Sequence, residues 1–491
     1  MLEAYLANDA TVSAWFGGAW STVGEIQQWY TEHGEQPSWH RAELAALAVA
    51  AIKDRAGPAS AIKQAQRLHD APTLAVVTGQ QPAIGGGPLL TLSKIAHAIA
   101  LTRQLEAAGT PAVTIFWCAS EDHDEGEANH ADLIARDGRI RRVHRALPKP
   151  GASLAWQPAS DWWPALQRAL HDCYPAGLGS SWWEALAPDP QEGMGRWTCR
   201  IIEQAFAGDG LICLEARELR PLAHDTLVKL IDHWPVDALA AQRDAVIAAG
   251  YEPAFPPLDS APLFADRSDE REALDHVGAR DLLASKPDLI STGAAVRPII
   301  QQAVLPAIAY CGGPGELAYH SLLAPIYAAA QVPRPRFIPR QQLSLAPSFI
   351  ARAAERWELP LSEFIADQPP RSPEPPGGAI DLSLLEQALS QLEEQQLKAP
   401  DHLKQRLAAG LARLNRETDR LAASLANGQR QRAELVPIGH LRDWLRPRNK
   451  PQDRVMSLAQ AFWQFGPGIV DDLITACASG APNQHHLITP D

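Results

Sequence analysis

Residues 74–118 read LAVVTGQQPAIGGGPLLTLSKIAHAIALTRQLEAAGTPAVTIFWC, with an apolar run at each end. Leu74–Val77 and Val113–Cys118 are almost wholly apolar, which is typical of central parallel strands that are covered on both faces. Between them, apolar residues recur at helical spacing from near Pro88 until Gly109 stops the helix. Proline suits a first helical turn because the N–H that it lacks has no partner there. This succession predicts a βαβ unit and therefore an α/β protein built on a parallel sheet.

The rest of the chain continues this alternation with interruptions. Residues 1–70 predict helices, whereas residues 145–200, rich in Trp and Pro, predict an insert over the sheet. Pro-rich residues 369–376 predict a linker. Short apolar runs predict further strands at 211–214, 303–310 and 336–338.

A leucine stripe runs through residues 380–435. Leucines follow 3-4-3 spacing from Leu382, and after a break at 399–401 the stripe continues to Leu425, with charged and amide side chains between. This pattern predicts an antiparallel α-helical coiled-coil hairpin, weakened locally where Gln396 and Thr418 occupy core positions. Such an arm organises a homodimer or docks on its own domain, and the pattern does not distinguish the two.

These boundaries predict seven segments along the chain. They are an N-terminal helical segment (1–70), the first half of the core (71–145), a connecting insert (146–205), the second half of the core with an insert near 235–290 (206–350), a linker (351–379), the hairpin (380–436) and a C-terminal helical segment (437–491).

Composition and charge narrow the class of protein. The chain has 491 residues, 46% of them hydrophobic, and a net charge of −13, which argues against general binding to nucleic acid or an anionic membrane. Its six cysteines form no C-x-x-C pair and predict reduced thiols, with Cys118 and Cys311 as small buried hydrophobic residues. No secretory signal opens the chain, and the apolar stretch at 44–52 is too short to span a bilayer. We therefore expect a soluble, cytoplasmic protein.

The loop Thr78–Pro88, TGQQPAIGGGP, is the first candidate site. It is neither the dinucleotide fingerprint nor the P-loop, but glycines permit close backbone approach and a helix start attracts anions. Gln80 and Gln81 offer hydrogen bonds to a sugar or base edge, and Lys94 lies two turns further on, where it could face a phosphate. The alternative is a plain loop between a strand and a helix.

The acidic run Glu121-Asp122-His123-Asp124 follows the strand that ends at Cys118. Ligands of open α/β sheets bind outside the carboxyl ends of strands, so this position favours a site over a solvated acidic turn. Carboxylates there suit an ammonium group, a ribose hydroxyl or Mg²⁺, and the imidazole suits proton transfer. No motif supports a zinc site.

Two further patterns lie downstream. Gly312–Glu316, GGPGE, follows the strand predicted at 303–310 and could line the same crevice, while Arg297 suits a carboxylate or phosphate. Arg448–Arg454, RNKPQDR, offers cations at a predicted helix start. The alternative for Gly312–Glu316 is that its glycines and proline only form a turn. The alternative for Arg448–Arg454 is an exposed basic turn without a ligand.

Taken in order, these pieces resemble the bacillithiol biosynthesis cysteine-adding enzyme family, the cysteine ligases. The matching residues are Thr78–Gln81, Gly87–Lys94, Phe116–Asp124 with Asn129, Val296–Pro298, Pro306–Glu316, Ile338–Arg340 and Lys450–Val455. The resemblance implies a Rossmann-like core of the class I nucleotidylyl-transferase type, inserted connecting segments, a coiled-coil hairpin and a homodimer. It also implies a ligase that joins L-cysteine to the amino group of glucosaminyl-malate, the last step of bacillithiol synthesis.

From this resemblance we predict the roles of individual residues. Asp122, His123 and Asp124 are the predicted catalytic residues, and the predicted substrate or nucleotide ligands are Thr78, Gly79, Gln80, Gln81, Gly87, Lys94, Glu121, Asn129, Arg297, Gly313, Gly315, Glu316 and Lys450. ATP is the expected activator, Mg²⁺ is possible, and no resident metal site is predicted.

Two residues depart from the family pattern, Glu125 in place of a hydrophobic residue and Ser93 in place of a histidine. The inserts are also short for the family. These departures bear on the exact substrate more than on the fold. Two other functions stay open: a non-catalytic dimeric scaffold of the same fold, which the hairpin motivates, or a nucleotidylyl transferase acting on another small acid or sugar.

Overall fold

The computed structural model describes residues 1–18, 22–356, 360–365, 382–430 and 436–490. The predicted linker at 369–376 lies outside these residues. The chain forms two compact units, Met1–Pro347 with Lys450–Asp491, and Ser348–Asn449. Within the described residues, no helix is both long enough and apolar enough to cross a bilayer.

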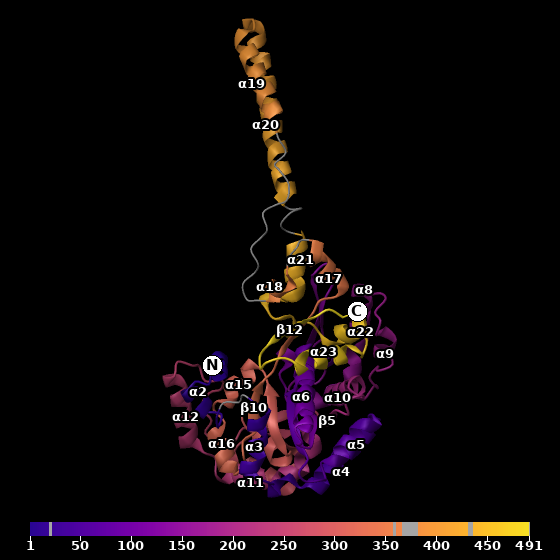
Figure 1. Ribbon diagram of the computed structural model, residues 1–491, viewed down its shortest axis with the longest axis vertical. Coiled ribbons are helices and arrows are strands. Elements are labelled where there is room, and N and C mark those ends of the chain that lie inside the picture. Colours follow the sequence, from indigo (N-terminus) through magenta and orange to yellow (C-terminus); the bar gives the residue numbers. More distant parts are fainter. Residues whose placement is uncertain (19–21, 357–359, 366–381, 431–435, 491) are drawn as a thin grey trace. The chain divides into compact units, whose positions relative to one another are not determined.

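A five-stranded sheet forms the centre of the first unit, with the order β10-β9-β1-β2-β5 and every neighbouring pair parallel. Numbered along the chain, these strands lie in the order five-four-one-two-three, which is the arrangement of Rossmann-like sheets. In Figure 1, the edge strands β10 and β5 lie on either side of α6. The strands are β1 Leu74–Gln80, β2 Ala112–Cys118, β5 Ile212–Glu215, β9 Ala307–Gly312 and β10 Arg336–Pro339.

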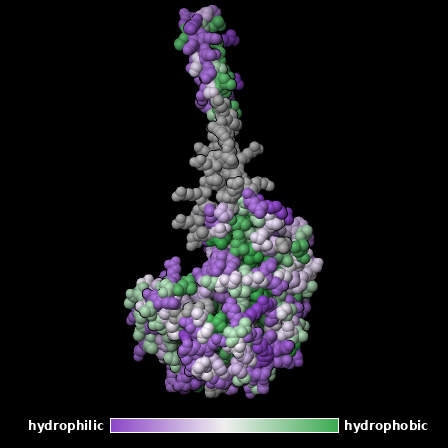
Figure 2. Space-filling model, in the orientation of Figure 1, coloured by the Kyte–Doolittle hydropathy of each residue, from purple (hydrophilic) through white to green (hydrophobic). Residues whose placement is uncertain are grey.

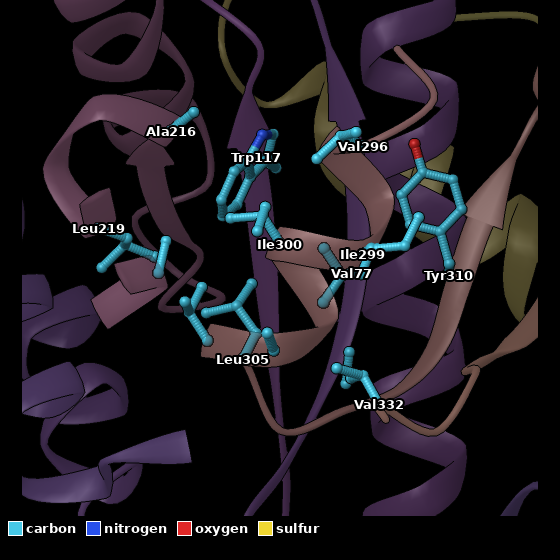
Figure 3. Packing of buried hydrophobic residues seen from close by; sticks show 14 of the residues in the cluster. Val77, Trp117, Ala216, Leu219, Val296, Ile299, Ile300, Leu305, Tyr310 and Val332 are labelled. Carbon is cyan, nitrogen blue, oxygen red and sulfur yellow. The ribbon is translucent and has the colours of Figure 1, made fainter. Parts of the chain in front are cut away.

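Two hydrophobic cores cover this sheet, one on each face. Along β1, Ala75 and Val77 join one core while Leu74 and Val76 join the other, because successive strand side chains point to opposite faces. On the first face Val77 packs with Ile299 and other residues of α14 (Figure 3). The continuous burial of β1, β2 and β9 explains why these strands are predictable from apolar runs.

Helices of the first unit surround the sheet. The predicted helices at the N-terminus are present, as is the long helix after the glycine loop. The helices are α1 Leu2–Leu6, α2 Ala10–Ala14, α3 Val23–His33, α4 Arg41–Asp54, α5 Ala59–Arg67, α6 Leu90–Ala107, α7 Glu125–Ala128, α8 Trp163–Cys173, α9 Ser180–Glu184, α10 Met194–Ala205, α11 His224–Asp232, α12 Val236–Ala248, α13 His276–Ser285, α14 Arg297–Val304, α15 Pro314–His320, α16 Ala324–Ala330, α22 Leu458–Phe465 and α23 Ile469–Ala478.

Three small sheets accompany the central one. β3 His130–Ile134 pairs antiparallel with β4 Ile140–His144, and β11 Gln342–Leu345 pairs parallel with β12 His485–Ile488. The third has the order β7-β6-β8. Its strands are β6 Leu263–Asp266, β7 Arg271–Leu274 and β8 Ile290–Thr292.

The prediction of a strand over residues 303–310 is wrong for its first residues. Ala303 and Val304 end helix α14, and β9 begins only at Ala307, after Pro306. A continuous apolar run does not distinguish a buried strand from a buried helix end, which accounts for the error. The long helix likewise begins at Leu90 and not at Pro88, and the helical tail also contains strand β12.

The tryptophan-rich insert is a packed aromatic cluster. Trp162 and Trp163 each pack against Trp197, with ring centroids 4.7 Å and 5.8 Å apart, and Trp183 stacks on Trp163 at 5.6 Å. Gly179 lets this insert contact α22, since its N–H donates to the Trp463 carbonyl at 3.0 Å. These tryptophans therefore form a core of their own.

The second unit is helical. Its helices are α17 Ser348–Arg356, α18 Leu361–Ile365, α19 Ser383–Lys398, α20 Asp401–Arg430 and α21 Val436–Leu445. α19 and α20 lie side by side (Figure 1), and Asn415 Nδ2 donates to Glu393 Oε1 at 3.0 Å between them. Leu384 and Leu414 are 79% and 50% exposed, and Figure 2 shows hydrophobic patches along this pair. The side chain of Leu425 lies outside the described part, and the coiled-coil character of the pair stays a prediction.

Candidate active site

A cavity of about 360 Å³ opens where β1, β2 and β9 end. β1 lies between β2 and β9, so the order of strands reverses there, and ligands of open α/β sheets bind at such a switch point. The cavity is lined by Gly79, Gln80, Gln81, Leu90, Lys94, Trp117, Ala119, Asp122, Glu127, Ala294, Arg297, Pro298, Gln301, Tyr310, Gly313, Gly315, Glu316, Tyr319, Arg340 and Arg454.

The end of β1 contributes the Gln-Gln pair. Gln81 Nε2 donates to Asp122 Oδ2 at 2.6 Å, which joins the loop after β1 to the loop after β2. Gly79 permits the two strands to approach, because a Cβ there would lie 2.8 Å from the Trp117 carbonyl oxygen. Thr78 is fully buried, and its hydroxyl donates to the Cys311 carbonyl at 2.8 Å, so it holds β1 to β9.

The glycine run packs against the C-terminal part of the unit. A Cβ on Gly85 would lie 2.9 Å from Ser457 Oγ, and one on Gly86 would lie 2.9 Å from Leu458 Cδ1. The Gly87 carbonyl accepts from Leu458 N at 2.9 Å, and Gly87 does not line the cavity. The glycine run itself is therefore covered by protein, whereas Leu90 at the start of α6 lines the cavity.

Lys94 and Glu316 form a buried charge pair across the cavity floor, with Nζ 2.6 Å from Oε2. The Lys94 ammonium also donates to the Gly79 carbonyl at 2.8 Å and to Gln80 Oε1 at 3.0 Å, so its three protons all have partners. Glu316 accepts from Tyr310 at 2.5 Å and from Gly313 N at 2.7 Å. Burial alone would raise the pKa of Glu316, but Lys94 and these hydrogen bonds lower it.

Asp122 faces the cavity from the acidic run. Its Oδ1 accepts from the backbone N–H groups of His123, at 2.8 Å, and Asp124, at 3.3 Å. Arg297 lies across from it, with Nη1 3.8 Å from Oδ2. Burial opposes ionisation, yet Arg297 and the bonds from Gln81 and His123 lower the pKa of Asp122.

Glu121 points away into a buried network. Arg220 donates to Glu121 Oε1 at 2.7 Å and to Asp266 Oδ2 at 2.5 Å, and Glu121 Oε2 also accepts from Thr292 N at 3.3 Å. This network fastens the β7-β6-β8 sheet to the loop after β2. Because it does not line the cavity, Glu121 has a structural role here.

His123, Asp124 and Asn129 flank the cavity without lining it. His123 is exposed, with its Nδ1 2.8 Å from Arg271 Nη1. Asp124 caps α7, since its Oδ1 accepts from Gly126 N at 2.9 Å, and Asn129 ends the same helix.

Three arginines give the cavity its positive charge. Burial opposes the charge of Arg297, but Tyr319, Asp122 and Tyr310 hold the pKa of the guanidinium above its ordinary value. Arg340 Nη1 donates to Asp453 Oδ2 at 2.5 Å, and Arg454 is exposed at the cavity wall. The predicted ligand Lys450 is exposed and does not line the cavity, whereas Arg454 of the same basic run does.

The cavity includes residues that the sequence did not single out. Glu127 stands at its wall, and the buried Trp117 Nε1 and Gln301 Nε2 have no hydrogen-bond partner within the described chain. Unpaired buried donors are rare, so these two suit an oxygen atom of a ligand or a bound water. Trp117 and Gln301 lie in apolar elements where periodicity predicts only burial, but Glu127 lies three residues after Asp124 in the same acidic segment.

A parallel sheet with a polar cavity at its switch point defines a Rossmann-like α/β protein. The match to a family model described as "Bacillithiol biosynthesis BshC, N-terminal Rossmann-like domain" extends over residues 1–341. The chain belongs to this family and, through it, is a ligase.

Curated relatives named "Putative cysteine ligase BshC" match the chain, two of them over nearly its whole length. The protein from Koribacter versatilis is 26% identical over 90% of this chain and 89% of its own, and that from Bacillus cytotoxicus is 24% identical over 99% and 97%. A relative from Geobacillus thermodenitrificans is 30% identical over 58% of each chain. A solved structure titled as an arginyl-tRNA synthetase from Campylobacter jejuni aligns with a TM-score of 0.26 and 10% identity, too low to carry an argument.

Proposed function

We propose that the protein joins the carboxyl group of L-cysteine to the amino group of glucosaminyl-malate, which is the last step of bacillithiol synthesis. One observation carries this proposal: Asp122, Arg297 and the Lys94–Glu316 pair, from both halves of the sheet, converge on one cavity. The family name of the curated relatives supports the same reaction class.

The charges of the cavity suit two small polar substrates. Arg297 and Arg454 suit the carboxylates of a malate group, whereas Asp122 and Glu127 suit an ammonium group. The unpaired donors of Trp117 and Gln301 suit a carbonyl or carboxylate oxygen.

Amide formation from a carboxylate is unfavourable in water, so the carboxyl group must carry a leaving group. Arginines also suit phosphate groups, and Arg340, the cavity arginine that is not assigned to malate here, is the residue that would hold ATP, which would supply that activation when bound. Asp122, with its lowered pKa, stays ionised and orients the amine through charge and hydrogen bonding.

Mass spectrometry of a mixture of the protein, L-cysteine, glucosaminyl-malate and ATP tests the reaction. We expect a conjugate whose mass equals the two substrates less one water, and its loss when ATP is omitted. Asp122→Ala should reduce turnover strongly, whereas Arg139→Met, an exposed control outside the cavity, should not. Product without ATP would remove ATP as the activator, and full turnover by Asp122→Ala would remove the site assignment.

The exposed leucines of α19 and α20 favour a second candidate function, a dimeric scaffold of the same fold that has lost catalysis. A strain deleted for the gene separates the two. We expect it to lack the bacillithiol-type thiol, and an unchanged thiol content would favour the scaffold.

A further inference from the structure

We propose that Glu127 is the group that takes the proton from the attacking amine, while Arg271 holds the neighbouring His123 as a hydrogen-bond donor. This inference rests on the amide-forming reaction proposed above. It reassigns the proton transfer that the sequence predicts for His123 or Asp124.

Three carboxylates line the cavity, and two of them are already engaged. Asp122 accepts from Gln81 and from its own loop and faces Arg297, while Glu316 accepts from Lys94, Tyr310 and Gly313. Every one of these contacts favours the charged carboxylate, so each makes Asp122 and Glu316 poorer proton acceptors.

Glu127 is the remaining carboxylate. Its backbone is fixed at the start of α7, where Glu127 N donates to Asp124 Oδ1 at 3.3 Å, but its carboxylate has no hydrogen-bonding partner in the described chain. The charged groups that face it are Asp124 and Asp122 of its own segment and Lys94 of α6. Glu127 is exposed, so its loss of hydration is only partial, but this loss, then Asp124 and Asp122, raise the pKa of Glu127. A raised pKa brings a carboxylate closer to that of the amine whose proton it takes.

The contact with Arg271 occupies the lone pair of His123 Nδ1. A guanidinium only donates hydrogen bonds, so the Nδ1 atom, 2.8 Å from Arg271 Nη1, must accept with its lone pair. In this contact the ring proton lies on Nε2, which is left to donate to a substrate oxygen.

Arg271 is itself held rigidly. Its Nε donates to Ser291 Oγ and its Nη2 to the Thr292 carbonyl, both at 3.0 Å. Its guanidinium also lies 3.8 Å from the centre of the Phe264 ring. The β7-β6-β8 sheet thus presents one fixed N–H group to His123, which makes Arg271 a positioning residue.

The amine nitrogen attacks the activated carboxyl carbon and forms the C–N bond, and the bond from that carbon to the oxygen of the leaving group breaks with its electron pair on the oxygen. A proton leaves the nitrogen and binds a Glu127 carboxylate oxygen, and it is returned to water after product release.

Steady-state kinetics of Glu127→Gln test the proton acceptor, with Glu125→Gln as the matched control from the same helix. We expect kcat for the amino-sugar substrate to fall about 100-fold or more, with KM changed less than about threefold. Hydroxylamine, which is neutral at pH 7, should still trap the activated cysteine at close to the wild-type rate. Glu127→Asp should recover part of kcat, and Glu125→Gln should behave as the wild type.

The result that overturns the proposal is a kcat of Glu127→Gln within about threefold of wild type. If wild-type protein forms no conjugate at all, the proposed function fails and this inference fails with it. If wild-type protein is active and Glu127→Gln is equally active, only this inference fails.

Nitrogen NMR of the histidine rings tests the role of Arg271 without any assay of activity. We expect the His123 signal to show Nδ1 without a proton and Nε2 with one, and this preference to be lost in Arg271→Met. Arg267→Met, from the neighbouring turn and exposed, is the control. A His123 ring protonated on Nδ1 in the wild type would contradict the proposal.

Discussion

At the scale of single residues, Lys94 is a predicted ligand-binding residue whose side chain instead binds other groups of the protein. Its ammonium is buried, and all three protons bind protein groups from β1 and from helix α15, which follows β9. Lys94 therefore joins the two halves of the sheet at the cavity floor, and the arginines are left to meet an anionic ligand.

Lys94→Met should destabilise the protein because it leaves the Glu316 carboxylate without its counter-charge. The expected loss is about 3–5 kcal/mol of unfolding free energy, which is typical of removing one partner from a buried pair. Chemical denaturation measures it, with the exposed Lys53→Met as control. A double variant Lys94→Met/Glu316→Gln should recover part of the loss, and stability equal to wild type in the single variant would contradict this account.

Acid should weaken the same pair. The folded pKa of Glu316 is lowered from its ordinary value of 4.5, so its stabilisation is present above that pH and is lost as the pH falls through the folded pKa. Thermal unfolding between pH 7 and pH 3 should show a smaller drop in Tm for Glu316→Gln than for wild type. Identical pH profiles would show that Glu316 contributes nothing to acid sensitivity.

The sequence predicts which residues stand at strand ends but not the partners that their side chains take. Gln81, Asp122 and Arg297 line the cavity, as their positions after β1 and β2 and before β9 suggest. Thr78 and Glu121 occupy equivalent positions, yet their side chains bind Cys311 and Arg220 instead. A one-residue change along a strand end turns a side chain to the other face, and long-range partners such as Arg220 have no local signal.

At the scale of elements, the glycine run Gly85–Gly87 also has long-range partners that its local sequence does not predict. Its composition suggests a ligand cradle, but Gly85 and Gly86 are needed because the start of α22 packs against them. That contact joins residues more than three hundred positions apart in the chain, and no sequence pattern in either segment predicts it.

Gly86→Val should therefore destabilise the protein. Its backbone φ is 81°, which disfavours a β-branched residue, and the new Cβ would collide with Leu458. We expect a loss of roughly 2–4 kcal/mol, measured as a fall in Tm. Gly208→Ala, where a Cβ meets nothing, should leave Tm unchanged, and an unaffected Gly86→Val would contradict the packing role.

The elements that the sequence predicts well are those with a continuous apolar run or a strong helical periodicity. β1, β2, β5 and α6 are buried on all sides or strongly periodic, and their apolar runs mark them to within a few residues. The strands of the three small sheets are short, and β4, β7 and β12 among them are only partly buried, so their patterns do not stand out from loops.

For the whole molecule, the leucine-rich pair α19 and α20 bears on assembly. We expect it to pair two copies of the chain, since leucines such as Leu407 and Leu414 remain 44% and 50% exposed in the single chain. Leu407→Glu/Leu414→Glu should halve the molar mass measured by light scattering, with Arg413→Glu on the same helix as control. A wild-type protein that is monomeric at micromolar concentration would contradict this prediction.

The strand order brings three loops, distant in sequence, to one cavity, and the reaction depends on that convergence. The most direct test is a crystal structure of the protein soaked with glucosaminyl-malate. We predict ligand density in the cavity, with the malate carboxylates at Arg297 and Arg454 and the amino group towards Asp122 and Glu127. Density at saturating ligand that lies elsewhere on the protein, with the cavity vacant, would contradict the account.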